Sequence, residues 1–256
     1  MSTTILQPEK QLEVAAAPRL SSGVKAFLKA LNSGDGPPLE TLPPLEAREV
    51  PVNAQASVQV DLSGIEESEK TITIDGYTIK LNVVRPKGVK GKLPVFIFIH
   101  GGSWVLGDYP THKRMVRDLV VLSGLAGVFV NYTRTPDARY PQAVNEIYAA
   151  TKWVAEHGEE IGVDGKNLAV VGNSVGGNMT AVTALKAKEK GGPVIKLQIM
   201  MWPIVDANFE TESYKRFGEK RFLTTPLMKW VYDLTRPTPK SAKKSTPLPY
   251  RLRSSN

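Results

Sequence analysis

The chain has 256 residues, a hydrophobic fraction of 41% and a formal net charge of +8, which favours one folded domain with a sizeable core. It contains no cysteine, so a disulfide framework, a thiolate metal site and a cysteine nucleophile are excluded. Its three histidines are scattered along the chain, and we expect neither a metal ion nor a cofactor. No apolar run is long enough for a membrane span.

Residues 1–60 are expected to form an N-terminal cap or leader region. Residues 24–32 have the spacing of a short amphipathic helix, whereas the proline pairs at 37–38 and 43–44 interrupt any long element. Residues 1–18 fit a loosely ordered leader as well as a part of the cap. A proline at position 18 stops the alanine run before it resembles a signal peptide, so the expected location is the cytoplasm.

Residues 61–213 are expected to form the core, where strand patterns alternate with helix patterns. The Asp75-Gly76 pair predicts a hairpin between strands at 71–74 and 77–84. The other predicted elements are strands at 94–99, 128–132, 168–171 and 197–202 and helices at 113–122, 143–157 and 176–188. This alternation predicts an α/β fold with a mostly parallel sheet flanked by helices.

The strand at 94–99 is followed by the glycine-rich run His100-Gly101-Gly102-Ser103-Trp104. Bare backbone N–H groups in such a loop can approach a carbonyl oxygen that gains negative charge during acyl transfer. Each such donor is worth roughly 3 to 4 kcal/mol in the transition state. We therefore expect an oxyanion loop in which Gly101, Gly102 and Ser103 lie at the reacting oxygen and His100 supports the loop.

The strand at 168–171 is followed by Gly172-Asn173-Ser174-Val175-Gly176-Gly177 and then by an alanine-rich helix pattern. This is a G-x-S-x-G pattern, in which a serine on a tight strand-to-helix turn has its hydroxyl lifted clear of the sheet. We expect Ser174 to be the catalytic nucleophile and Val175 to add an oxyanion donor. The expected supporting residues of the turn are Gly172, Asn173, Gly176 and Gly177.

Together with Asn131-Tyr132-Thr133-Arg134 between them, the two motifs resemble the hormone-sensitive-lipase type of α/β-hydrolase esterase over roughly residues 25–235. The resemblance implies an α/β-hydrolase fold with a helical cap and hydrolysis of short-chain acyl esters. The chain departs from the usual family pattern at Ser103, Asn173 and Val175. All three keep their backbone N–H groups, while the larger side chains of Ser103 and Val175 narrow the acyl site.

A serine hydrolase also needs a base and an acid, which in this family follow the nucleophile in sequence. His100, His112 and His157 all precede Ser174, and no later carboxylate has the family's acid context; Asp206 fits a loop or helix cap. We interpret His100 as structural and the other two histidines as surface or helix-cap residues. Two hypotheses follow: an esterase, or a catalytically inactive relative that binds a ligand or has no function.

Residues 214–235 are expected to form a cap helix region, and residues 236–256 a basic tail. Residues 214–256 hold 11 lysines and arginines against 2 acidic residues. Many prolines and few apolar residues favour a disordered tail over one that binds nucleic acid or a membrane surface. The resemblance ends near Thr235, so we expect a C-terminally truncated fold that lacks the last strands. The expected partner is a small acyl ester, and the sequence predicts no oligomeric state.

Overall fold

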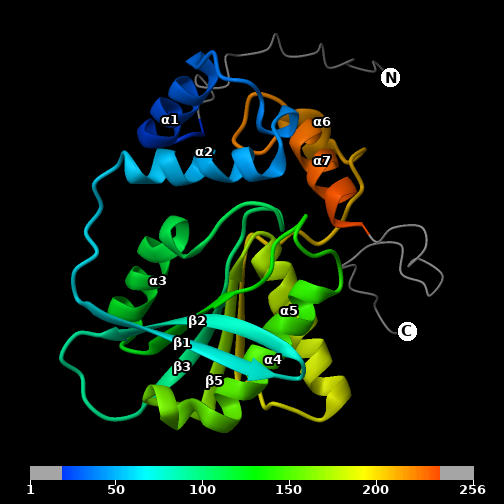
Figure 1. Cartoon of the computed structure of the whole chain (residues 1–256). Coiled ribbons are helices and arrows are strands. Elements are labelled where there is room, and N and C mark those ends of the chain that lie inside the picture. Colours follow the sequence, from blue (N-terminus) through cyan, green and yellow to red (C-terminus); the bar gives the residue numbers. More distant parts are fainter. Residues whose placement is uncertain (1–18, 237–256) are drawn as a thin grey trace, which may run out of the picture. The chain divides into compact units, whose positions relative to one another are not determined.

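The structure is a computed structural model that describes residues 19–236, and a sheet of six strands forms the centre of its larger unit (Figure 1). The predicted leader at 1–18 and the predicted tail beyond residue 236 lie outside the described residues. The described residues divide into a smaller unit of 19–42 with 208–230 and a larger unit of 43–207 with 231–236. The expected boundaries at residues 60 and 213 stay predictions.

The sheet has the strand order β1-β2-β4-β3-β5-β6. Its strands are β1 (Ile65–Ile74), β2 (Tyr77–Pro86), β3 (Leu93–Ile99), β4 (Ala126–Asn131), β5 (Val163–Asn173) and β6 (Leu197–Met201). β2 is antiparallel to both of its neighbours, and the pairs from β4 through β3 and β5 to β6 are parallel. The predicted mostly parallel sheet is therefore confirmed, including the hairpin at Asp75-Gly76.

Three helices pack on this sheet: α3 (Tyr109–Ser123), α4 (Gln142–His157) and α5 (Val175–Lys190). α3 contacts β2 and β4, whereas α4 and α5 contact β5 and each other. Phe96 and Phe98 pack against Val116 of α3, and Ile97, whose side chain points to the opposite face, is equally buried. Both faces of β3 are thus covered, which explains its continuous apolar sequence.

The other helices are α1 (Ser22–Ser33), α2 (Pro44–Ala56), α6 (Glu212–Phe217) and α7 (Thr225–Thr235), with short 3-10 turns at Leu39–Thr41 and Gly158–Ile161. The sequence pattern predicted no helix over residues 44–56. Pro44 stands at the start of α2, where a missing N–H is harmless, and the helix also accommodates Pro51. A proline pair that predicted an interruption therefore marks the beginning of a helix.

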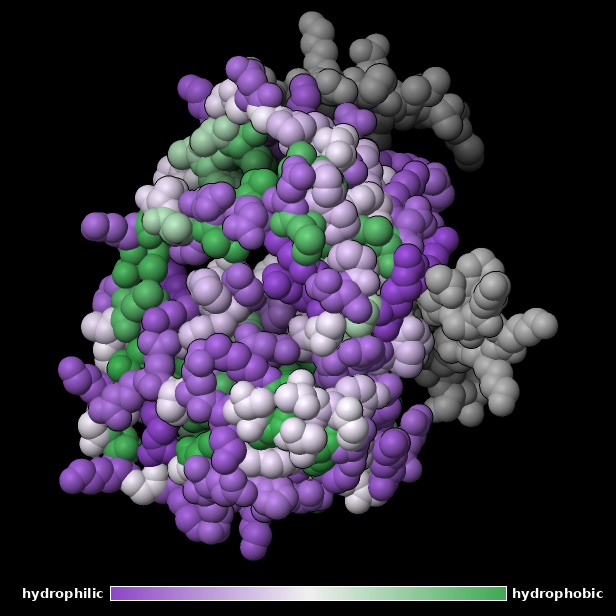
Figure 2. Space-filling model, in the orientation of Figure 1, coloured by the Kyte–Doolittle hydropathy of each residue, from purple (hydrophilic) through white to green (hydrophobic). Residues whose placement is uncertain are grey.

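Polar side chains cover most of the face shown in Figure 2, with apolar residues in separate patches between them. Over the described residues, no helix combines the length and the apolar character that a membrane crossing requires. Within the same residues, no group of three or more histidine, aspartate or glutamate side chains is arranged to hold a metal ion.

Candidate active site

Ser174 stands between the end of β5 at Asn173 and the start of α5 at Val175, with φ 56° and ψ −122°. A positive φ is uncommon outside glycine and costs of order 1 to 3 kcal/mol. The turn is held by the end of β6, because Ser174 N donates to the Met201 carbonyl at 2.9 Å and Ile204 N donates to the Ser174 carbonyl at 3.3 Å. The serine is only half-buried, and its side chain makes no capping hydrogen bond to the start of α5.

Two glycines allow the elbow to approach the end of β3. A Cβ on Gly176 would lie 2.0 Å from the Ile99 carbonyl oxygen, so α5 can start here only without a side chain. A Cβ on Gly101 would lie 3.1 Å from the Ser174 Cβ and 2.9 Å from the Asn173 carbonyl oxygen. The glycine-rich loop and the nucleophile elbow, far apart in sequence, are therefore in direct contact.

The loop after β3 is closed by its own backbone and tied to the elbow. Leu106 N donates to the Gly102 carbonyl at 2.7 Å, and Gly101 N donates to Asn173 Oδ1 at 3.0 Å. Gly101, expected at the reacting oxygen, therefore uses its N–H to position the loop. The N–H groups of Gly102, Ser103 and Val175 donate to no acceptor among the described residues, which leaves them available to an anionic oxygen.

His100 lies buried at the base of this loop. Its ring stacks on Tyr132 with centroids 4.1 Å apart and on Phe129 at 5.2 Å, and its Nδ1 lies 2.6 Å from the Gly101 carbonyl oxygen. Burial, together with the neighbouring His112 and Arg134, holds the pKa of His100 well below its usual value of 6.5. A neutral imidazole that donates from Nδ1 to the Gly101 carbonyl holds the loop in place.

The structure brings His112, but not His157, to the elbow. His112 Nε2 lies 3.5 Å from Asn173 Nδ2, and burial lowers the pKa of His112. The sequence interpretation of His112 as a surface or cap residue missed this contact with the elbow. His157 closes α4 at the surface, where it stacks on Trp153 and its Nδ1 lies 3.4 Å from Glu160 Oε1.

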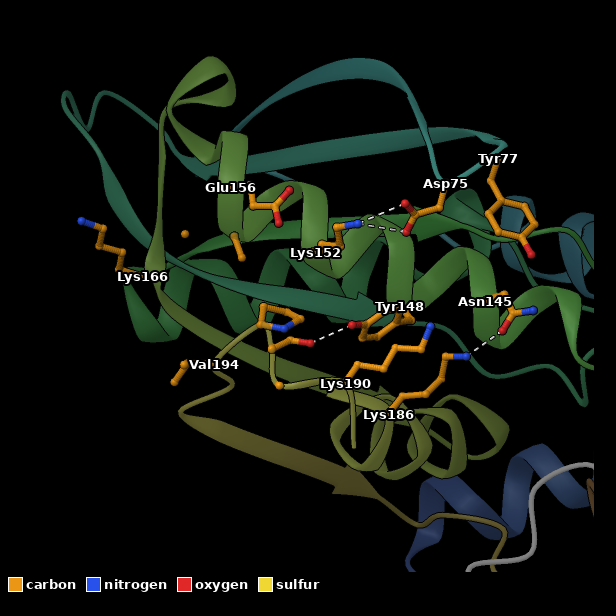
Figure 3. Close-up of a pocket in the computed structure, with 15 residues that line it drawn as sticks. Asp75, Tyr77, Asn145, Tyr148, Lys152, Glu156, Lys166, Lys186, Lys190 and Val194 are labelled. Atoms are coloured by element: carbon orange, nitrogen blue, oxygen red, sulfur yellow. Dashed lines mark hydrogen bonds and ion pairs between the residues drawn. The ribbon is translucent and has the colours of Figure 1, made fainter. Parts of the chain in front are cut away.

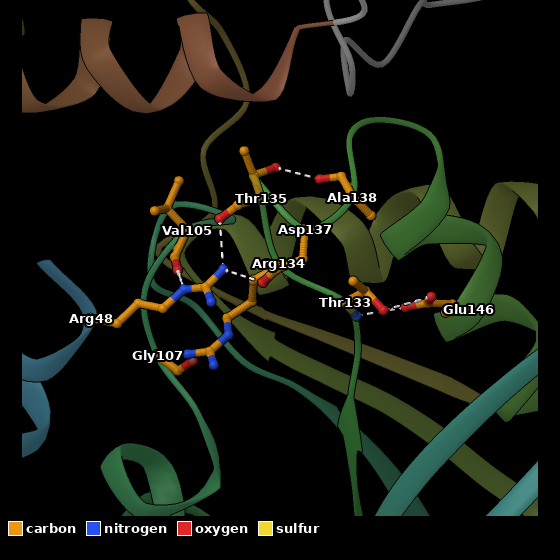
Figure 4. A network of polar contacts seen from close by, with 9 residues as sticks. All are labelled: Arg48, Val105, Gly107, Thr133, Arg134, Thr135, Asp137, Ala138 and Glu146. Carbon is orange, nitrogen blue, oxygen red and sulfur yellow. Dashed lines mark hydrogen bonds and ion pairs between the residues drawn. The ribbon is translucent and has the colours of Figure 1, made fainter. Parts of the chain in front are cut away.

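Two arginines hold the outer part of the loop through its carbonyl groups (Figure 4). Arg48 of α2 is buried and donates from Nε to the Val105 carbonyl and from Nη2 to the Thr135 carbonyl, both at 2.9 Å. Arg134 donates from Nη1 to the Gly107 carbonyl at 2.5 Å. Arg48 has no signal in the sequence, whereas Arg134 belongs to the family-like motif.

The segment that carries Arg134 is itself anchored by a buried carboxylate. Glu146 of α4 accepts hydrogen bonds from Thr133 N at 2.6 Å and from Thr133 Oγ1 at 2.8 Å (Figure 4). Gln142 Nε2 donates to the same carboxylate at 2.8 Å. The buried charge is therefore satisfied by three donors, which fixes the position of residues 133–135 beside the oxyanion loop.

Fold and site together define an α/β protein built around a serine on a strand-to-helix turn, with a glycine-rich loop beside it. The family model described as the alpha/beta hydrolase fold matches residues 96–253. The chain therefore belongs to the α/β hydrolase fold family, as its motifs predicted.

Solved and curated relatives agree with this assignment. The crystal structure of a thermostable esterase from Pseudomonas putida ECU1011 is 59% identical with a TM-score of 0.85, covering 89% of this chain and 72% of that one. Carboxylesterase NlhH of Mycobacterium tuberculosis is 37% identical over 147 residues, covering 57% of this chain and 46% of its own length. Ethyl acetate hydrolase of Pseudomonas putida is 30% identical over 164 residues, covering 63% and 52%. The chain spans about half the length of these curated relatives.

Proposed function

We propose that the protein is a carboxylic ester hydrolase that transfers the acyl group of its substrate to Ser174. The observation that carries this proposal is the strained serine of the elbow, which contacts a loop with uncommitted N–H groups. Membership of the α/β hydrolase fold family supports it, and so do relatives named esterase, carboxylesterase and ethyl acetate hydrolase.

In the proposed reaction, Ser174 Oγ attacks the ester carbonyl carbon and its proton passes to a base. The N–H groups of Gly102, Ser103 and Val175 stabilise the oxyanion, the alcohol leaves with a proton, and water then hydrolyses the acyl-serine. Ser103 and Val175 stand where the related family motifs have smaller residues, which favours short acyl chains. The substrate class is therefore a small acyl ester.

No described side chain forms a hydrogen bond with Ser174 Oγ, and the pKa of both His100 and His112 is lowered by burial. Oxyanion donors and substrate binding alone leave a rate of about 10³ to 10⁴ over the uncatalysed reaction. A rate of ester hydrolysis above this range would therefore indicate that a base accepts the proton of Ser174.

The test is hydrolysis of p-nitrophenyl acetate and butyrate by the purified chain and by two serine variants. We expect turnover that is lost in Ser174→Ala and retained in Ser33→Ala, because Ser33 lies exposed at the end of α1. A fluorophosphonate should add one label per chain, and mass spectrometry should place it on Ser174.

Equal background rates in the parent and in Ser174→Ala, with no label on Ser174, would refute the proposal. A Ser174-dependent rate above the range for oxyanion donors alone would show that a base acts, and His112→Gln then tests whether His112 is that base. The proposal includes a cytoplasmic location, which cell fractionation with an antibody against the chain tests.

A further inference from the structure

A cavity of about 980 Å³ lies along α4 (Figure 3). One wall comes from the turn between β1 and β2, and the opposite wall from the end of α5 and residues 191–194. The cavity lies entirely within the larger unit of the chain. Its lining residues contain no part of the oxyanion loop or the elbow.

The cavity is lined by four lysines and two carboxylates, namely Lys152, Lys166, Lys186, Lys190, Asp75 and Glu156. The carboxylate of Asp75 is already neutralised, because it accepts two contacts from Lys152 Nζ at 3.0 and 3.2 Å. Lys186 and Lys190 form no ion pair with any described residue. The end of the cavity at α5 therefore carries an excess of positive charge, which the neighbouring carboxylate of Glu189 only partly offsets.

These two lysines converge on one aromatic ring. The ammonium groups of Lys186 and Lys190 each lie 5.4 Å from the centroid of the Tyr148 ring. Tyr148 is buried, and its hydroxyl donates to the Gly192 carbonyl at 2.7 Å, so the ring is fixed in place. Lys186 Nζ also donates to Asn145 Oδ1 at 2.8 Å, which directs its ammonium toward the cavity (Figure 3).

The convergence has an electrostatic consequence. Burial and the neighbouring charge of Lys190 lower the pKa of Lys186. A dianion between the two ammonium groups would remove this repulsion. Lysine ammonium groups bind phosphate as point charges, and the cavity contains no arginine. A phosphoryl group concentrates nearly two negative charges on one centre, whereas a carboxylate carries only one, so two neighbouring ammonium groups suit a phosphoryl group better.

We propose that this cavity binds a small phosphorylated molecule, with the phosphoryl group held between Lys186 and Lys190 beside Tyr148. The amide NH₂ of Asn145 adds a neutral donor at the same end, since its Oδ1 serves Lys186. This site does not depend on the proposed ester hydrolysis, because it shares no residue with it.

The test is isothermal titration calorimetry of the full chain with inorganic phosphate and with glycerol 3-phosphate, at an ionic strength kept constant with sodium chloride. We expect saturable binding of one anion per chain, at least tenfold weaker in the double variant Lys186→Gln with Lys190→Gln. Lys190→Gln alone, which alters only an exposed side chain, should weaken binding about threefold. Binding of free phosphate, of the ester or of both identifies the source of the phosphoryl group.

Lys188→Gln is the matched control. Lys188 lies in the same last turn of α5 and interacts with the same helix dipole, but it does not line the cavity. It should retain binding within twofold, and so should Ser174→Ala, which removes the proposed esterase nucleophile. The proposal is overturned by an absence of saturable binding, by an equal loss in Lys188→Gln, or by succinate binding as tightly as phosphate.

Discussion

At the scale of single residues, His100 and His112 make the stability of the folded state depend on pH. Burial lowers the pKa of both histidines, so the unfolded chain, in which histidine has a pKa of about 6.5, takes up protons first. The stability contributed by the neutral rings is fully present above pH 6.5 and is lost as the pH falls below it. Each histidine contributes a slope of up to about 1.4 kcal/mol per pH unit.

We therefore expect the free energy of unfolding to fall between pH 6.5 and pH 5, above the range in which most carboxylates titrate. Urea unfolding at pH 7.5, 6.5 and 5.5 measures the slope. His112→Gln should reduce this slope by about half, because it removes one of the two buried histidines. An unaltered slope in His112→Gln would contradict this explanation.

A second prediction for a single residue concerns Gly176, where any side chain would collide with the backbone of β3. The Cβ of Gly176→Ala would lie 2.0 Å from the Ile99 carbonyl oxygen, and neither β3 nor α5 can move without disturbing the core. We expect a loss of about 3 kcal/mol in the free energy of unfolding, at the upper end for overpacking.

The control for Gly176→Ala is the same substitution at Gly23 of α1. A Cβ at Gly23 has no atom within 4 Å, and the residue lies inside a helix. Gly23→Ala should therefore raise the free energy of unfolding by about 0.5 kcal/mol. Losses of similar size in the two variants, measured by urea unfolding, would show that the close contact at Ile99 is not what limits position 176.

At the scale of elements, α2 is attached to the oxyanion loop through Arg48. Replacing Arg48 by Met keeps an unbranched, flexible side chain but removes the guanidinium group, which leaves the Val105 and Thr135 carbonyls without their donor. Each buried unsatisfied group costs about 1 to 3 kcal/mol, so we expect Arg48→Met to lower the free energy of unfolding by about 3 kcal/mol.

Asp137→Asn removes the ion pair of Arg48 but keeps the hydrogen bonds of Arg48 to the two carbonyl groups, so it measures the contribution of the charge alone. The Asp137 side chain is 55% exposed, and an ion pair in such a position contributes less than about 1 kcal/mol. Urea unfolding of both variants should show a much smaller effect for Asp137→Asn. Equal losses would mean that the ion pair, rather than the loop carbonyls, attaches α2.

At the scale of the whole molecule, the sequence predicted those features that have a local cause. Continuous apolar residues predict the strands at 94–99 and 168–171, and the glycines around Ser174 predict the elbow. The alternation of strands and helices then restricts the topology, so the α/β hydrolase fold was predictable. The first residues of β5 were not predictable, because Asp164 and the polar residues after it lack a strand pattern. The pairing of β5 with β3 is also interrupted between Asp164 and Leu168.

The remaining features depend on distant parts of the chain. His112 reaches Asn173 only because of the rotation and packing of α3, which no spacing in the sequence encodes. Arg48 donates to the Val105 carbonyl from α2, a helix that the sequence did not predict because it contains Pro44 and Pro51. Lys186 and Lys190 of α5 contact the ring of Tyr148 only because α5 packs against α4. Side chains that converge from separate elements require the folded arrangement.

The smaller unit is assembled from two stretches of chain that are far apart in the sequence. Asn32 Nδ2 donates to the Lys220 carbonyl at 3.2 Å across a separation of 188 residues, and Phe27 contacts Phe222 with ring centroids 5.8 Å apart. At about 5 to 20 residues per second, a ribosome needs roughly 10 to 40 s to synthesise that interval. During translation the contacts of α1 with this second stretch therefore form only after residues near 220 have emerged from the ribosome.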